Sequence, residues 1–280
     1  MNIVQQHFKT KFYLDSERSP RFQVTQVDKA LNSAITDIVL DRYHNIRQEQ
    51  RKYAFQTSQR LRDELYTLVQ KVDDLQAQGD ILLASHFPDD YMLALIVIAN
   101  ISGQSIHTVP ITYDEFSVIE LDPFSRPSLT WPQRVYRIES AEGIKIIFGD
   151  IGSLVDGTMY YVKKPATVSI GTEVSNGGTT LYPGTSIIAY VDTNLIMYRQ
   201  SGGTFNYTLK EGEILLIGSV GGEAYGIVDT GIVFTDYVNC DLPEILHEEV
   251  CRKAAQILSG NVENYNREAS LIKDIKNTEQ

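Results

Sequence analysis

The stretch from Gly171 to Phe234 is interrupted at short intervals by turn-forming residues, and this spacing restricts the possible folds more than any other feature of the chain. The turn signals are Asn-Gly-Gly from Asn176, Pro183-Gly184, Gly202-Gly203 and Glu211-Gly212. Between them lie short runs rich in β-branched and aromatic residues, which are typical of half-buried strands. We therefore predict that residues 166–233 form an inserted domain, a small antiparallel barrel or sandwich.

The N-terminal part of the chain has helical periodicity instead. A capping-box-like pair, Thr25 and Asp28, precedes apolar residues at three- and four-residue steps. The pattern resumes after a polar stretch and continues to Gly79, which predicts that residues 1–78 are a helical region, either one long helix or a helical hairpin. The apolar positions are Leu31, Ala34, Ile35, Ile38, Val39 and Ile46 in the first part, and Leu61, Leu65, Leu68, Val69, Val72 and Leu75 in the second.

Residues 79–165 read as a β core. The run YMLALIVIANI predicts a strand, residues 135–148 predict a hairpin that turns at Glu142-Gly143, and Pro165 ends a further strand. The proline-rich stretch 107–133 is expected to cross the surface as a long ordered excursion without regular structure. Asp241 and Pro243 then open a C-terminal helix, and we group 234–280 with 79–165 as one α/β core. The predicted fold class is α+β.

Composition limits the function classes. The chain of 280 residues carries a net charge of -11, which argues against a non-specific nucleic-acid binder because that affinity depends on Lys and Arg. Its two cysteines do not form a disulfide framework, and it contains neither a signal peptide nor an apolar run long enough to span a bilayer. We expect a protein made in a reducing cytoplasm, or assembled from there, without contact with a membrane.

The motif HEEVC places His247, Glu248 and Cys251 near the spacing of zinc-peptidase ligands. A helix brings residues four positions apart onto one face, but two ligands do not make a metal site, and the other histidines have no matching spacing. The stripe of Leu246, Val250, Ala254, Ile257 and Leu258 explains the same positions as one face of an amphipathic helix.

The acidic pair Asp114 and Glu115 is interpreted as a solvated turn, and no phosphate loop, nucleophile elbow or dinucleotide fingerprint occurs in the sequence. We predict no catalytic, cofactor-binding or metal-binding residues, and no enzymatic activity.

The order of these parts resembles virion structural proteins of tailed phages, in particular ring or head-tail connector proteins of crAss-like phages. The similar segments are spread over most of the chain, from the first helix to the last; they are RDELYTLV, FPDDYMLAL, ITYDEF, DPFSRPS, YRIES with GIKI, YYVKKPATV and DLPEILHEEVCRKAAQILSG. The resemblance implies a structural protein that forms a ring, dodecameric by family likeness, around the tail axis near the portal. It also implies that the portal and other tail ring proteins are partners, that genomic DNA passes through the ring, and that the protein is located in the virion. A net negative charge suits such a DNA conduit.

Aromatic and arginine side chains dominate interface energetics, so those in two segments are our candidate interface residues. Trp131 is the preferred anchor, although a core position would explain that tryptophan equally well. The candidates are Tyr43, Arg47, Arg51, Tyr53 and Phe55 in the first segment, and Phe124, Arg126, Trp131 and Arg134 in the second.

Two other functions compete with this interpretation. Tyr190, Tyr198 and Tyr207 of the inserted domain could form a surface that stacks on sugars, which would make the protein a glycan- or host-surface-binding tail module; cross-strand pairing explains the same tyrosines. A hydrolase that uses His247 is the third possibility, and it requires a bound metal ion.

Overall fold

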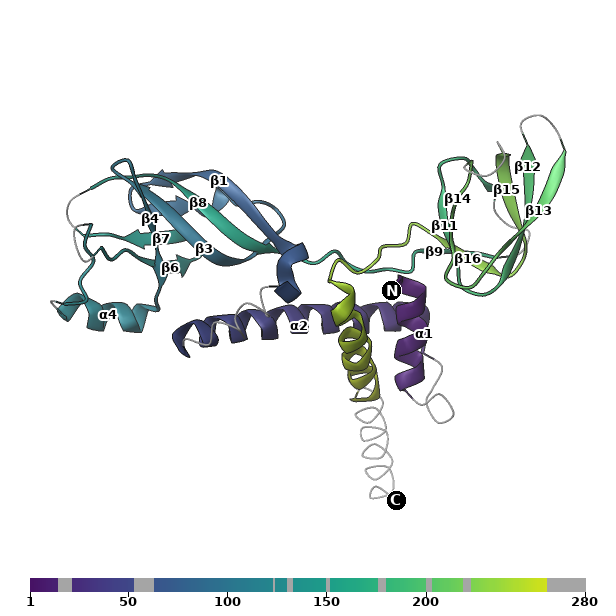
Figure 1. Ribbon diagram of the computed structural model, residues 1–280, viewed down its shortest axis with the longest axis horizontal. Helices are drawn as coiled ribbons and strands as arrows, with labels where there is room; N and C mark the ends of the chain where they lie inside the picture. The colour runs from purple at the N-terminus through teal and green to yellow at the C-terminus, as the bar shows by residue number, and fades with distance from the viewer. Residues whose placement is uncertain are drawn as a thin grey trace, which may run out of the picture. The chain divides into compact units, whose positions relative to one another are not determined.

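A computed structural model describes residues 1–14, 22–52, 63–122, 124–129, 133–149, 152–175, 180–199, 203–218 and 223–260, without the side chains of 44–52, 223 and 224. The chain divides into two compact units (Figure 1). Residues 68–164 form the barrel unit. Residues 1–67 and 165–280 form the helical-sandwich unit. No helix among the described residues is long and apolar enough to cross a membrane.

The barrel unit is built on one mixed eight-stranded sheet in the order β4-β3-β8-β1-β2-β7-β6-β5. Only the β5–β6 pair is parallel among the strand pairs of this sheet in the described structure. The strands are β1 (Val69–Gln78), β2 (Ile81–Leu83), β3 (Tyr91–Ile101), β4 (Gln104–His107), β5 (Val109–Pro110), β6 (Tyr136–Ser140), β7 (Gly143–Ile147) and β8 (Leu154–Lys163). The predicted hairpin is β6 and β7, and the predicted end before Pro165 is the end of β8.

The sheet closes almost completely on itself. Its two terminal strands, β4 and β5, are separated in sequence by Thr108 alone. The amide and the hydroxyl of Thr108 both donate to the carbonyl of Val97 on β3, at 3.0 and 2.8 Å, and the Val109 amide donates to Val135 beside β6 at 2.9 Å. The chain therefore steps from one edge of the sheet to the other, and the enclosed space is filled by aliphatic side chains such as Leu82, Val97, Ile144 and Met159.

The prediction of helix up to residue 78 is wrong, because β1 begins at Val69. Val72 and Leu75 are three residues apart, which fits a helix, whereas a regular strand would place them on opposite faces. β1 has a register shift between these two residues, with Asp74 at a left-handed φ of 57°. This irregularity returns Leu75 to the barrel interior beside Val72, so a bulged strand imitates the helical spacing.

The prediction that residues 107–133 lack regular structure is also wrong. α4 (Tyr113–Leu121) lies in this stretch, and its first turn is closed by a capping box. The Glu115 amide donates to the Thr112 hydroxyl at 3.3 Å, and the Glu115 carboxylate accepts from the Thr112 amide at 2.9 Å. Asp114 and Glu115 therefore belong to a helix start, where acidic side chains are favourable, rather than to a free turn.

The helical-sandwich unit contains α1 (Ile3–Tyr13), α2 (Val24–Lys52), a helical turn at 63–65 and a C-terminal helix at 244–260. The short helix η1 (Tyr66–Leu68) crosses the boundary to the barrel unit, which begins at Leu68. Asp28 does not cap α2; its carboxylate lies 2.8 Å from His7 Nε2 of α1. α2 is continuous from 24 to 52, and the last part of the predicted helical region is strand from Val69 onward. The choice between one long helix and a hairpin depends on residues 53–62, which lie outside the described residues.

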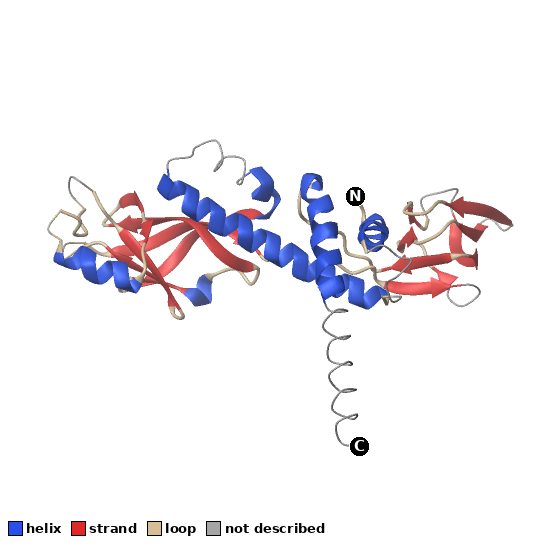
Figure 2. Ribbon diagram, turned by 90° about the horizontal axis from the view of Figure 1, so that it is seen from below, coloured by secondary structure: helices blue, strands red, loops and turns tan. Residues whose placement is uncertain are grey.

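Two four-stranded antiparallel sheets, β10-β15-β12-β13 and β14-β11-β16-β9, enclose one apolar core and confirm the predicted sandwich (Figure 2). Gly231 has φ 106°, and a Cβ there would lie 2.4 Å from the Thr193 hydroxyl, so this β15–β16 turn requires glycine. The strands are β9 (Thr172–Ser175), β10 (Thr180–Leu181), β11 (Ser186–Ala189), β12 (Thr193–Arg199), β13 (Thr204–Leu209), β14 (Ile214–Leu216), β15 (Glu223–Thr230) and β16 (Ile232–Thr235).

The predicted grouping of 234–280 with 79–165 is wrong, because the C-terminal helix packs against α1 and α2. Cys251 Sγ donates to the Gln6 carbonyl at 3.6 Å, and Lys253 pairs with Asp41 at 2.9 Å. α1 in turn contacts the sandwich, where Phe8 stacks on Tyr190 with 5.0 Å between the ring centroids. Helices from both ends of the chain and the inserted sandwich therefore form one unit.

Candidate interaction surface on the barrel unit

The most exposed apolar side chains of the barrel unit include a group on α4 and the loop that follows it. Tyr113, Val118, Leu121 and Phe124 are 61, 68, 80 and 85% exposed. We name these four residues the α4 ridge. Isolated exposed apolar residues are normal on soluble proteins, but four of them on one short helix and the loop after it indicate a candidate interaction site.

The position of the ridge follows from the helical period. Phe116 and Ile119 face the barrel, where they pack with Ile111, Ile138 and Ile147. Val118 and Leu121 are three residues apart and lie on the opposite side of the same helix, because a turn of α-helix takes 3.6 residues. α4 is therefore apolar on two faces, of which the barrel covers one; Figure 1 and Figure 2 both show it along the outside of the strands.

Hydrogen bonds to the backbone hold the loop after α4. The Phe124 amide donates to the Asp122 carboxylate at 3.0 Å, and the Tyr136 hydroxyl donates to the Ser125 carbonyl at 2.8 Å. Hydrogen bonds from Ser125 and from the Phe124 amide keep the pKa of Asp122 below its ordinary value of 3.8. Phe124 thus sits on a fixed loop with its ring in solvent.

Arg126 and Arg134 also support this loop. Arg126 Nε donates to the Glu120 carbonyl at 3.1 Å, and the Arg134 guanidinium donates to the Phe124 carbonyl. Both were candidate interface residues, and the structure places them together with Phe124. Their contacts are to the backbone, so they position the ridge.

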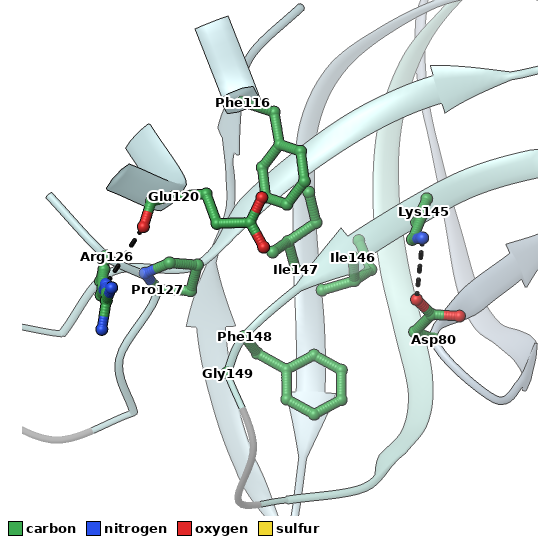
Figure 3. Close-up of a pocket in the computed structure, with 10 residues that line it drawn as sticks. All are labelled: Asp80, Phe116, Glu120, Arg126, Pro127, Lys145, Ile146, Ile147, Phe148 and Gly149. Atoms are coloured by element: carbon green, nitrogen blue, oxygen red, sulfur yellow. Dashed lines mark hydrogen bonds and ion pairs between the residues drawn. The ribbon is translucent and has the colours of Figure 1, made fainter. Parts of the chain in front are cut away.

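A cavity of about 540 Å³ lies beside the ridge, between α4 and β7 (Figure 3). Its lining includes the apolar side chains of Phe116, Ile147 and Phe148, and the Glu120 carboxylate points toward Phe116 and Ile147. Arg126 lines the same cavity. Asp80 and Lys145 form an ion pair at 3.5 Å in the same lining. Among the described residues none pairs with the Glu120 carboxylate. Aromatic rings beside a carboxylate suit a cationic side chain, because the ring faces and the carboxylate both attract positive charge.

The other candidate interface residues have different outcomes. Tyr43 is 6% exposed and belongs to the hydrophobic core of α2, so it is not available as a surface anchor in this structure. The side chains of Arg47 and Arg51, and all of Tyr53, Phe55 and Trp131, lie outside the described residues.

His247 and Cys251 are packing residues. His247 is 4% exposed and its Nε2 lies 2.8 Å from the Leu242 carbonyl. Burial lowers the pKa of His247 and raises the pKa of Cys251. No cluster of three or more metal-ligating side chains occurs in the described part of the chain. The helix-face interpretation of the HEEVC motif therefore agrees with the structure.

The three tyrosines proposed for sugar stacking do not share a face. Tyr190 is stacked on Phe8 and accepts a hydrogen bond from Lys11 Nζ at 2.7 Å. Tyr207 is the cross-strand partner of the buried Leu195 and packs on the sandwich core. Tyr198 lies on the other face of the same sheet, where it stacks on Tyr225 at 4.4 Å. The structure does not form the expected aromatic platform.

Sequence reasoning missed Tyr113, Val118 and Leu121, although a signal was present. Thr112 and Glu115 have capping-box spacing, and the nine residues after Thr112 contain apolar residues on every side of a helical wheel. Because Pro110, Pro123 and Pro127 flank the segment, the composition suggested a loop.

Comparisons with known proteins give no family. No family model matches the chain, and no curated protein matches it by sequence. Among solved structures, a cAMP-bound mutant of the regulatory subunit of a cAMP-independent protein kinase A from Trypanosoma brucei is similar over 73% of this chain and 85% of that chain. The identity is 9% and the TM-score is 0.22, a likeness too weak to indicate a common fold.

Proposed function

We propose that this protein is a structural component of a tailed-phage virion. It forms a homo-oligomeric ring around the tail axis near the portal, joins neighbouring tail proteins and provides a conduit for DNA. The phage context comes from the sequence resemblance described above. The oligomeric role has separate support from the surface of the barrel unit.

The observation that carries the proposal is the α4 ridge. Four large apolar side chains, each more than 60% exposed, lie on a capped helix and a hydrogen-bonded loop. Apolar anchors on a rigid element are the usual core of a protein–protein interface, because little conformational entropy is lost when they bind.

The two-unit organisation also fits an assembly protein. Each unit has its own apolar core, one in the barrel and one in the sandwich. A ring subunit has to contact copies on two sides and other rings above and below, and separate units provide separate contact surfaces. The net charge of -11 suits a channel that DNA passes through without adhering.

Mass photometry of the purified full-length chain tests the proposal. We expect closed oligomers of one size, visible as rings by negative-stain microscopy. If the chain stays monomeric at micromolar concentration, both alone and with its neighbouring tail proteins, the ring proposal is wrong.

The glycan-binding alternative receives no support from the tyrosines on which it rested, since they do not form one surface. The hydrolase alternative would need a metal-binding set at His247, and that side chain is instead buried with its Nε2 2.8 Å from the Leu242 carbonyl. We propose neither function.

A further inference from the structure

We infer that the α4 ridge of one copy binds the basic, aromatic segment 47–62 of a second copy. The choice of a second copy as the partner rests on the proposed ring. The contact between ridge and segment is argued separately, from charge and surface chemistry.

The ridge lies in acidic surroundings. α4 contains Asp114, Glu115 and Glu120 and no basic residue, and Asp122 follows at its end. These four carboxylates outnumber the two nearby arginines, Arg126 and Arg134, which remain charged although they donate to backbone carbonyls. A partner for this surface needs apolar side chains for the ridge and positive charge for its margins.

Such a segment is rare in a chain with a net charge of -11. Residues 47–62, RQEQRKYAFQTSQRLR, contain five basic residues and one acidic residue, together with Tyr53 and Phe55. No other stretch of this length in the sequence carries as much net positive charge. Its composition therefore matches both requirements of the ridge.

The cavity beside the ridge adds a specific place for one basic side chain. Phe116 and Phe148 provide aromatic surface, and the Glu120 carboxylate points toward Phe116 and Ile147 (Figure 3). The lining also contains two basic side chains: Lys145 is paired with Asp80, and Arg126 donates to the Glu120 carbonyl rather than to its carboxylate. An arginine or lysine that enters here could pair with the Glu120 carboxylate. It would displace no existing ion pair, because no described residue is paired with that carboxylate. In this arrangement the apolar side chains of the segment contact the α4 ridge, and one basic side chain of the same segment enters the cavity.

The direct test uses a fluorescent peptide of residues 47–62 and the full-length chain as receptor. The receptor carries Arg51→Glu and Arg60→Glu, which weaken its own segment so that it does not compete for the ridge. We expect saturable binding that weakens as the salt concentration rises from about 0.1 to about 0.5 M, because ions screen exposed charges. Adding Val118→Asp and Leu121→Asp to the receptor should weaken binding by about tenfold or more, since apolar anchors dominate such contacts.

Matched controls separate a specific contact from general charge attraction. A peptide of the same composition in scrambled order should bind about tenfold more weakly, and Ile245→Asp, a change at a 73% exposed apolar residue of the helical-sandwich unit, should leave peptide affinity unchanged. Circular dichroism establishes that each receptor is folded. If the native peptide does not bind, or binds the ridge variant equally well, the inference is wrong whatever the oligomeric state of the chain.

A mixing experiment decides whether the contact is between copies. The ridge variant, with Val118→Asp and Leu121→Asp, keeps an intact segment, and the segment variant, with Arg51→Glu and Arg60→Glu, keeps an intact ridge. Each should be monomeric alone, and a mixture should give dimers of one chain of each kind, because only one functional contact is available per pair. Peptide binding without mixed dimers would place the contact within a chain and overturn the second-copy assignment. Wild-type rings that tolerate both variants would overturn it as well, and would leave the proposed function standing.

Discussion

α4 and the C-terminal helix 244–260 both contribute apolar residues to a core, but they differ in how much of their apolar surface is covered. The C-terminal helix buries Leu246, Val250 and Leu258 almost completely. In α4 no residue is fully buried, and Val118 and Leu121 project into solvent while Phe116 and Ile119 cover the barrel. In the C-terminal helix the apolar stripe is covered when the unit folds, whereas α4 keeps one apolar face exposed to solvent. This difference is the basis for our proposal that α4 is an interface helix and the C-terminal helix a structural one.

The strongest contrast should come from the same substitution in each helix. Val250→Asp places an unpaired carboxylate at a fully buried site, and we expect it to lower the free energy of unfolding by about 4 kcal/mol or to prevent folding. Leu121→Asp should change that free energy by less than about 0.5 kcal/mol, because its side chain is already in water. Urea unfolding followed by circular dichroism measures both. Equal losses would mean that α4 is also a core helix.

The pH dependence of stability should depend on the C-terminal helix. Burial holds the folded-state pKa of His247 below its ordinary value of 6.5, so the unfolded chain binds more protons when the pH falls below 6.5. The free energy of unfolding should therefore decrease as the pH falls from 6.5 toward the folded-state pKa of His247. Above pH 6.5 the contribution of the neutral His247 to stability should be fully present. In His247→Gln this part of the slope should disappear. An unchanged slope in that variant would assign the dependence to other groups.

Removing the cap of α4 tests whether the ridge needs a preformed helix. Thr112→Ala deletes the hydroxyl that accepts from the Glu115 amide and should destabilise α4 by about 1 kcal/mol. We expect weaker binding of the 47–62 peptide, since the ridge then has to be ordered during binding. Ser117→Ala, an exposed change within the same helix, is the matched control and should bind normally. If both variants bind equally, helix order does not limit the contact.

The smallest effect is expected on the solvent face of the C-terminal helix. Arg252 pairs with Glu248 at 2.6 Å, but the two side chains are 62 and 46% exposed. Arg252→Ala should lower the free energy of unfolding by about 0.5 kcal/mol or less, because exposed ion pairs are screened by water and salt. A loss above about 2 kcal/mol would show that this face is also needed for folding.

The fold was predictable where local signals agreed with the tertiary structure. Turn residues such as Pro183-Gly184 and Glu211-Gly212 favour backbone conformations that end strands. Their positions therefore marked the strand ends from which the sandwich was predicted. The apolar stripe of the C-terminal helix was equally clear. β1 could not be recognised because the bulge at Asp74 converts a strand into a three-residue apolar repeat. Only strand pairing with β8, which lies far along the chain, reveals the bulge.

The candidate site was predictable only in part. Phe124, Arg126 and Arg134 were selected by residue type, and the structure brings them together on one loop. Residue type could not show that the two arginines bind carbonyls, since that depends on how the loop folds back on α4. The exposure of Val118 and Leu121 was also hidden, because an apolar residue in a sequence does not indicate which face of a helix is covered.

Mass photometry of the wild-type chain and of the Val118→Asp, Leu121→Asp variant tests the central claim most directly. We predict that the wild-type protein forms closed oligomers, and that the variant is a folded monomer with an unchanged free energy of unfolding. An Ile245→Asp variant should assemble as the wild-type protein does. Rings of normal size from the α4 variant would contradict the claim that the α4 ridge holds the subunits together.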